Sequence, residues 1–211
     1  MCDQKQTELD LIRLGFRIKN TETIVPALVP VKTRYFLGLC DGRHAPLSFA
    51  LLELNLAVLL PMDADELRGG ALHDILDDQV HDFLLRLAWS GVVALVHAAA
   101  PCSKHSIMRN YPGGPPPVRT KEFMDGWDGM SPAQLEENQS SRKIHLRAAG
   151  VVVTTYTMGG HGSWETPPTS LAVIEECNMT LFDKLKAFFI MVTSCPWGWR
   201  VGKKKVVGHI L

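Results

Sequence analysis

The chain has 211 residues, of which 46% are hydrophobic and 21% are charged, and its formal net charge is 0. This composition fits one compact domain with a sizeable core, and it argues against a disordered or fibrous protein. Residues 1–100 carry a net charge of −4 and residues 101–211 carry +4, so any attraction for a polyanion falls to the second half.

The cysteines and the apolar runs indicate in which cellular compartment the protein is expected. The five cysteines are odd in number, show no Cys-x-x-Cys spacing and follow no signal-sequence pattern at the N-terminus. These features predict a reduced, intracellular protein of the nucleus or cytoplasm. The longest uncharged run, Leu87–Ser103, is interrupted by polar residues, glycine and proline, so we expect no membrane span.

The first part of the chain predicts an extension followed by a strand and a helix. Residues 1–32 include the stretch IVPALVP, whose prolines discourage regular structure, so the domain proper is expected over residues 33–211. The apolar run RYFLGLC, residues 34–40, predicts a buried parallel strand that ends in the turn Asp41-Gly42. Pro46 then suits the first turn of a helix.

Two further strands and a helix are predicted before residue 101. The run AVLLPMD, residues 57–63, predicts a second strand that ends on the acid Asp63. Asp77 can cap a helix whose apolar positions recur at helical spacing up to Gly91. The run VVALVHAAA, residues 92–100, then predicts a third buried strand.

The second half predicts a long loop and alternating elements. Residues 102–130 contain glycines, prolines and scattered charges and are expected to form a surface loop. Ser131, Pro132 and Gln134 form a capping pattern for a polar helix to about residue 149. The β-branched stretch GVVVTTYTM, residues 150–158, predicts a fourth strand, and residues 159–170 predict a loop before a short helix. A last amphipathic helix is expected around LFDKLKAFFIMV, residues 181–192.

The alternation of strands and helices predicts an α/β fold with a doubly wound, mostly parallel sheet. Ligands of such sheets bind beyond the carboxyl ends of the strands. Those ends carry Asp41-Gly42, Asp63, Pro101-Cys102-Ser103 and Glu165-Thr166-Pro167. An acid after the second strand is typical of a site that binds the ribose of a nucleoside. Asp63 is therefore a candidate nucleoside-binding residue, although an ordinary solvated aspartate explains this position equally well.

Cys102 is a candidate reactive thiol. It follows a proline and lies near Lys104, His105 and Arg109, whose positive charges would lower the pKa of a thiol. The alternative is a buried, inert cysteine, which is the commoner state of a free thiol. The spacing of the histidines around Cys102 matches no zinc signature, so no metal is expected.

The tryptophans and lysines near the end of the chain are candidates for contact with nucleic acid. Trp164, Trp197 and Trp199 precede the basic run Lys203–Lys205. Aromatic and basic groups together suit stacking on bases and contact with phosphates. Core tryptophans and a solvated charge run explain the same residues almost as well.

These residues resemble the catalytic core of cytosine-5 DNA methyltransferases, and more closely the methyltransferase-like domains of mobile elements and protist genomes. The family motif Pro-Pro-Cys-Gln-x-Phe-Ser corresponds to APCSKHS, which keeps Pro101, Cys102 and Ser106. The family motif Glu-Asn-Val or Glu-Asn-Pro corresponds to ETP, which keeps Glu165 and Pro167. The loop Phe-x-Gly-x-Gly-Gly corresponds to CDGRHA, which keeps Gly42. With the partial matches HDILDD, GGPPPVRT and CPWGWRVGKKK, the similarity spans about residues 34–210.

The resemblance implies a Rossmann-like, class I methyltransferase fold with S-adenosylmethionine as cofactor and DNA as partner. The Cys102 thiolate would attack C6 of a flipped-out cytosine, and Glu165 would hydrogen-bond N3 of the ring. The cofactor would be bound by Asp41, Gly42, Asp63 and Pro101. Nucleic acid would be contacted by Ser106, Arg109, Lys203 and Lys204.

The sequence departs from the family at several positions. His44 and Ala45 replace loop glycines, Gly38 stands where an acid is frequent, and Thr166 replaces the motif asparagine. The 46 residues after Glu165 are too few for a target-recognition domain, so base-specific readout is not expected, and truncation at the C-terminus stays open. Two alternatives also stay open: a catalytically inactive domain that binds nucleic acid or protein, and an amino-methyltransferase.

Overall fold

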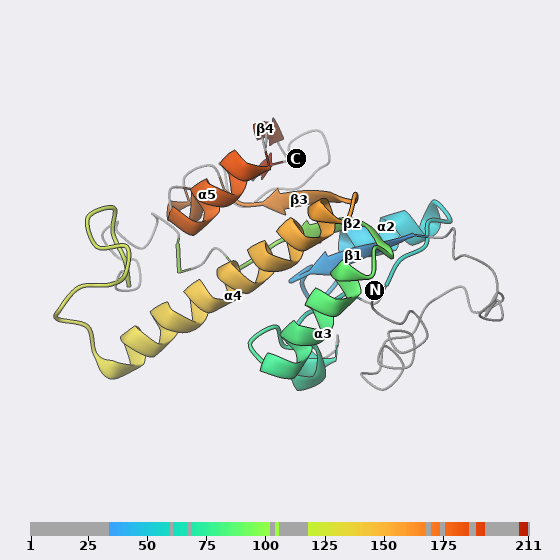
Figure 1. The fold of residues 1–211 in the computed structure, drawn as a ribbon. Helices are drawn as coiled ribbons and strands as arrows, with labels where there is room; N and C mark the ends of the chain where they lie inside the picture. Colours follow the sequence, from blue (N-terminus) through green and yellow to red (C-terminus); the bar gives the residue numbers. More distant parts are fainter. Residues whose placement is uncertain are drawn as a thin grey trace, which may run out of the picture. The chain divides into compact units, whose positions relative to one another are not determined.

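The computed structural model describes residues 34–59, 61–66, 69–101, 104–105, 118–167, 170–173, 176–185, 189–192 and 207–210 (Figure 1). The chain divides into two compact units, which we describe separately. The first unit comprises Met1–Ala99 and Gly150–Ser163, and the second comprises Ala100–Ala149 and Trp164–Leu211. The extension expected over residues 1–32 lies outside the described residues.

The first unit contains a small parallel sheet, as the sequence predicts. Strand β1 (Tyr35–Leu39) pairs in parallel with β2 (Val93–Ala98), and Leu37, Leu39 and Val96 are fully buried. These are continuous apolar runs, which is typical of strands covered on both faces. In the order of hydrogen-bonded strands, β2 is followed by β3 (His161–Glu165), whose first three residues belong to this unit.

The predicted second strand is present only as isolated parallel bridges beside β1. Phe36 is bridged to Val58 and Leu39 to Met62, both in parallel. The amides of Phe36 and Cys40 donate to the carbonyls of Ala57 and Met62 at 2.9 and 2.6 Å. The chain therefore reaches Asp63 at the same end of the sheet at which β1 ends.

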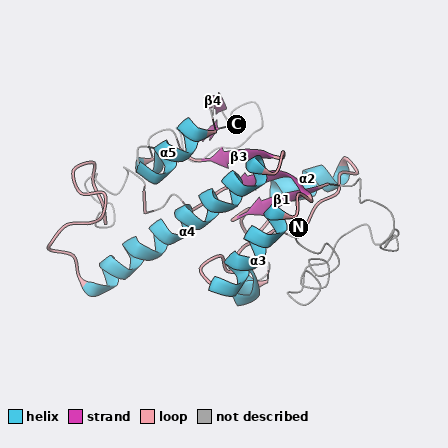
Figure 2. Cartoon of the chain, viewed as in Figure 1, coloured by secondary structure: helices cyan, strands magenta, loops and turns pink. Residues whose placement is uncertain are grey.

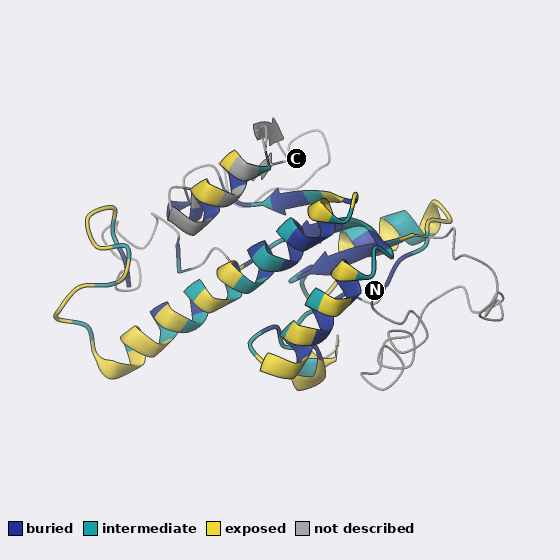
Figure 3. Ribbon diagram, in the orientation of Figure 1, coloured by how far each residue is buried: buried dark blue, intermediate teal, exposed yellow. Residues whose placement is uncertain are grey.

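Helices α2 (Pro46–Glu53) and α3 (Asp78–Trp89) and a short 3₁₀ helix, η3 (Gly70–His73), also belong to the first unit (Figure 2). The predicted apolar stripe of α3 is confirmed, because one face of this helix is buried (Figure 3). Its buried residues are Val80, Phe83, Leu84, Leu87 and Ala88. Burial of this stripe holds α3 in the unit.

Asp77 is the N-cap of α3, as predicted. Its carboxylate accepts hydrogen bonds from the amides of Gln79 and Val80 at 2.8 and 3.1 Å. We expect Asp77→Ala to lower the free energy of unfolding by about 1 kcal/mol, because two amides lose their acceptor. Urea unfolding checks this value. Asp82→Ala on the exposed side of the same helix is the control and should stay within about 0.5 kcal/mol of the parent protein.

The prediction of a strand over residues 150–158 is wrong. This stretch is the end of one 26-residue helix, α4 (Pro132–Thr157), and the strand β3 forms later, where a loop was predicted. Val151 and Val152 are buried, so packing overrides the β preference of branched residues. The hydroxyls of Thr154 and Thr157 donate to carbonyls four residues earlier at 2.8 and 2.9 Å, which accommodates them in the helix.

The second unit contains the first eighteen residues of α4, the end of β3 and the C-terminal elements. The predicted capping pattern of α4 is confirmed, since the Ser131 hydroxyl accepts from the Gln134 amide at 3.3 Å and the Gln134 side chain accepts from the Ser131 amide at 2.9 Å. The later elements are η5 (Leu171–Val173), α5 (Glu176–Lys184), β4 (Phe189–Val192) and β5 (Val207–Ile210). Strand β5 pairs in antiparallel fashion with both β3 and β4.

The prediction of one helix across residues 181–192 is half wrong. Helix α5 ends at Lys184, and residues 189–192 form β4. The pattern Phe-Phe-Ile-Met-Val is continuous and apolar, which fits a short strand as well as a helix, and pairing with β5 decides between them. Among the described residues, no helix is both long and apolar enough to cross a membrane.

Candidate functional site

The structure brings the two predicted cofactor loops of the first unit together. The amide of Gly42, in the loop after β1, donates to Oδ2 of Asp63 at 2.9 Å. The amide of Asp65 donates to Oδ1 of the same carboxylate, also at 2.9 Å. Asp63 is therefore held by one backbone donor on each oxygen while its side chain stays partly exposed. Each oxygen keeps a lone pair that can accept a hydrogen bond from a ligand.

Asp41 has a different role from its neighbour Gly42. It is buried, and its Oδ2 accepts from the hydroxyl and the amide of Ser48 at 2.5 and 3.3 Å. Ser48 lies in the first turn of α2, so the carboxylate satisfies a helix N-terminus. A Cβ at Gly38 would lie 3.0 Å from both side chains, which explains why a residue without a side chain stands there.

The loop between β1 and α2 keeps a glycine-like backbone. Gly42 has φ +73°, and a Cβ built on it would have no heavy atom within 4 Å, so its α-carbon borders open space. Ala45 is fully buried, yet its φ of 40° and ψ of 55° lie in the left-handed region that favours glycine. Ala45 therefore holds this loop in a left-handed conformation that glycine adopts more readily.

Cys40, which the sequence did not single out, lies in the same loop. Its removal from water, together with the nearby carboxylates of Asp63 and Asp74, raises the pKa of the thiol to about 12. A raised pKa means that the thiol stays protonated at neutral pH. Cys40 is thus a poor nucleophile, because the thiolate is the reactive form.

Pro101 and Glu165 both belong to the second unit. Pro101 is exposed, and its carbonyl accepts from Nε2 of His145 at 3.4 Å. Glu165 is the last residue of β3 and pairs in register with His209. The other predicted residues of the catalytic and nucleic-acid sites lie outside the described residues: Cys102, Ser106, Arg109, Lys203 and Lys204.

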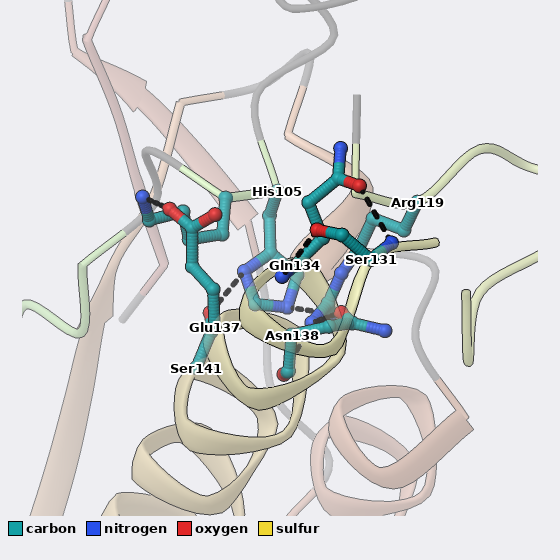
Figure 4. Close-up of polar contacts among 8 residues, drawn as sticks. His105, Arg119, Ser131, Gln134, Glu137, Asn138 and Ser141 are labelled. Carbon is teal, nitrogen blue, oxygen red and sulfur yellow. Dashed lines mark hydrogen bonds and ion pairs between the residues drawn. The ribbon is translucent and has the colours of Figure 1, made fainter. Parts of the chain in front are cut away.

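The second unit also contains a buried polar cluster that sequence reasoning missed (Figure 4). Arg119 is 2% exposed and donates to Nε2 of His105, and to the backbone and side-chain oxygens of Asn138. Nδ1 of His105, a residue with no exposed surface, lies 3.4 Å from the Ser141 hydroxyl. An available signal was the spacing of Asn138, Ser141 and His145, which places polar side chains along one side of α4, the side that the structure buries while the residues between them stay exposed or half-buried.

The aromatic side of this cluster continues from His145. The ring of His145 lies 4.1 Å from that of His105 and 5.6 Å from that of Trp164, between centroids. Trp164 in turn contacts Phe182 edge-to-face at 6.4 Å. Trp164 is 3% exposed, so this tryptophan, which the sequence suggested for stacking on bases, is a core residue.

Comparison with known proteins gives no match: no family model matches the chain, and neither does any curated protein or solved structure. Within the described residues, no group of three or more histidine, cysteine, aspartate or glutamate side chains could hold a metal ion. The functional interpretation therefore depends on the geometry of the two units.

Proposed function

We propose that this chain is a methyltransferase-like domain that binds S-adenosylmethionine at the end of the small parallel sheet and acts on DNA, or descends from a domain that did. The observation that carries the proposal is the contact between Gly42 and Asp63. It joins the loops that follow two neighbouring parallel strands, which is where α/β sheets bind nucleosides. The finer fold assignment, a doubly wound class I methyltransferase, belongs to this proposal.

The residues present fit a nucleoside ligand. Asp63 offers two carboxylate oxygens that backbone amides already orient, and a ribose diol needs such an acceptor. Gly42 borders open space, so a ligand can approach the backbone there. When bound, S-adenosylmethionine would supply an electrophilic methyl group.

The charge at the start of α2 favours a ligand without phosphate. Helix N-termini commonly bind phosphate groups through free amides and the positive end of the helix dipole. Here the carboxylate of Asp41 already accepts from the amide of Ser48. A dinucleotide phosphate at this place would meet a buried negative charge, whereas S-adenosylmethionine has a positive sulfonium and no phosphate.

The catalytic half of the proposal rests on the resemblance. Cys102 would act as the thiolate that attacks cytosine, and Glu165 would hydrogen-bond the ring. Glu165 ends strand β3, a position that suits a group presented to a ligand. The competing thiol of Cys40 is unsuited to the nucleophilic role because its pKa is raised.

A calorimetric titration with S-adenosylmethionine tests the cofactor site. We expect saturable binding, and we expect Asp63→Asn to raise Kd by about tenfold or more, because one charged acceptor is replaced by a donor. Asp82→Asn, on the exposed side of α3, is the charge-matched control and should bind like the parent protein. Absence of heat and of saturation at about millimolar ligand, with the fold intact, would refute the proposal.

A further inference from the structure

A loop in the second unit presents two large aromatic side chains to water. Phe123 is 55% exposed and Trp127 is 44% exposed, and both lie between Arg119 and the start of α4. Figure 3 shows this segment exposed along most of its length. Leu135, in the first turn of α4, is exposed as well. Aromatic side chains are enriched at protein interfaces, so this stretch of surface is a candidate docking site.

Hydrogen-bonded turns give the loop a defined path. The amide of Gly126 donates to the carbonyl of Phe123 at 3.2 Å. The amide of Met130 donates to the carbonyl of Trp127 at 3.1 Å. The indole of Trp127 lies against the backbone of Gly129, because a Cβ built there would overlap the ring. The aromatic side chains are therefore presented by an ordered loop, which lowers the entropy cost of binding a partner.

Both ends of the loop are anchored in the second unit. Val118 and Arg119 are buried where the loop begins, and the guanidinium of Arg119 donates to the carbonyl of Asn138 at 3.0 Å. Where the loop ends, the reciprocal hydrogen bonds of Ser131 and Gln134 cap α4. The exposed aromatic residues thus lie between two fixed points of the chain.

The charge around the aromatic residues decides which partner they fit. Residues 120–139 carry five acidic side chains and one basic side chain, a net charge of −4. The rest of residues 101–211 carries 12 basic and 4 acidic side chains, a net charge of +8. Two of the acids, Asp125 and Glu137, form ion pairs with basic side chains from outside residues 120–139, which leaves a net charge of −2. A negative surface repels a polyanion such as nucleic acid and attracts a cationic partner.

We infer that residues 120–136, which we call the acidic aromatic surface, form a docking site for a lysine- and arginine-rich segment of a partner protein. Phe123 and Trp127 contact the cationic side chains through their ring faces, where tryptophan gives the strongest cation–π attraction. The exposed carboxylates of Glu122 and Asp128 pair with the same cations. The inference goes beyond the proposed function and is independent of it, because the cofactor residues Gly42 and Asp63 belong to the first unit.

Fluorescence anisotropy of a labelled peptide tests the surface in the full chain. The probe alternates arginine and lysine with glycine and serine. We expect saturable binding that weakens with salt, and we expect Trp127→Ala to raise Kd about fivefold, because an exposed cation–π contact is lost without a change of charge. Trp89→Ala is the matched control, since Trp89 on α3 is 53% exposed, and it should bind like the parent protein.

A second variant removes the charge and leaves the rings in place. Glu122→Gln combined with Asp128→Asn should raise Kd of the peptide about threefold at low salt, because exposed ion pairs are weak. Asp82→Asn, on the exposed side of α3, is the control and should leave Kd unchanged. Far-ultraviolet circular dichroism checks that each variant is folded.

The pattern of binding decides the outcome. Equal peptide binding by Trp127→Ala and the parent protein would overturn the inference, and so would a lack of saturation at about millimolar peptide. Single-stranded DNA is the competing probe, and weaker DNA binding by Trp127→Ala with unchanged peptide binding would assign the surface to nucleic acid instead. Sedimentation in which only Trp127→Ala loses self-association would assign it to a second copy. S-adenosylmethionine binding should be unchanged in Trp127→Ala, so failure of the cofactor proposal would appear separately.

Discussion

Arg119→Met is expected to lower the free energy of unfolding by about 3 kcal/mol, because it removes one buried donor group from several acceptors. The guanidinium is 2% exposed and donates to His105 and twice to Asn138. Methionine fills much of the volume but leaves those acceptors without a donor, and each such loss costs about 1–3 kcal/mol before relaxation. Urea unfolding of the full chain provides the value.

The matched control for Arg119 lies on α4. Arg142 pairs with Asp125, and both side chains are substantially exposed to water. Solvent screens such a pair, so Arg142→Met should change the free energy of unfolding by less than about 1 kcal/mol. A similarly small effect for Arg119→Met would show that the cluster does not stabilise the second unit.

Gly160→Ala should destabilise the first unit by about 2–3 kcal/mol, because the added methyl group has no room. A Cβ at Gly160 would lie 2.7 Å from the carbonyl oxygen of Val93 and 2.7 Å from the methyl carbon of Thr155. The carbonyl belongs to strand β2 and cannot move without disturbing the sheet. The midpoint of urea unfolding should fall accordingly.

Gly150 is the control with the opposite expected sign. It lies inside α4, and the nearest side-chain atoms, of Leu85 and His81, would be 3.8 and 3.9 Å from an added Cβ. Gly150→Ala should therefore stabilise the protein by up to about 1 kcal/mol through helix propensity. Destabilisation by both alanine variants would mean that steric contact is not what distinguishes the two sites.

Local sequence patterns were sufficient to predict an element where one structural preference dominated the segment. The α/β class, β1, β2, the Asp77 cap and the Ser131 capping pattern all follow from continuous apolar runs or from side chains that satisfy a helix end. The segment of residues 150–158 was assigned wrongly because its β-branched residues favour a strand locally. Burial of Val151 and Val152 in the helix outweighs that preference, and only the tertiary structure reveals it.

Some residues of the candidate site could be predicted from the sequence, and others could not. The strand-end rule selects Gly42 and Asp63, and the structure places them in contact. It could not reveal that Asp41 is turned into the helix N-terminus, since neighbouring aspartates look alike in a sequence. Arg119 was assigned to a surface loop, and a buried arginine is too rare to expect without its acceptors in view.

Ala45 has a consequence for how relatives of this chain can be recognised. The residue adopts a left-handed backbone at a cost of about 1–2 kcal/mol, and its methyl group is buried. A comparison by residue identity sees only an alanine at this position, whereas a comparison of backbone torsions sees the left-handed conformation that favours glycine. Ala45→Gly should therefore relieve the backbone cost without rerouting the loop.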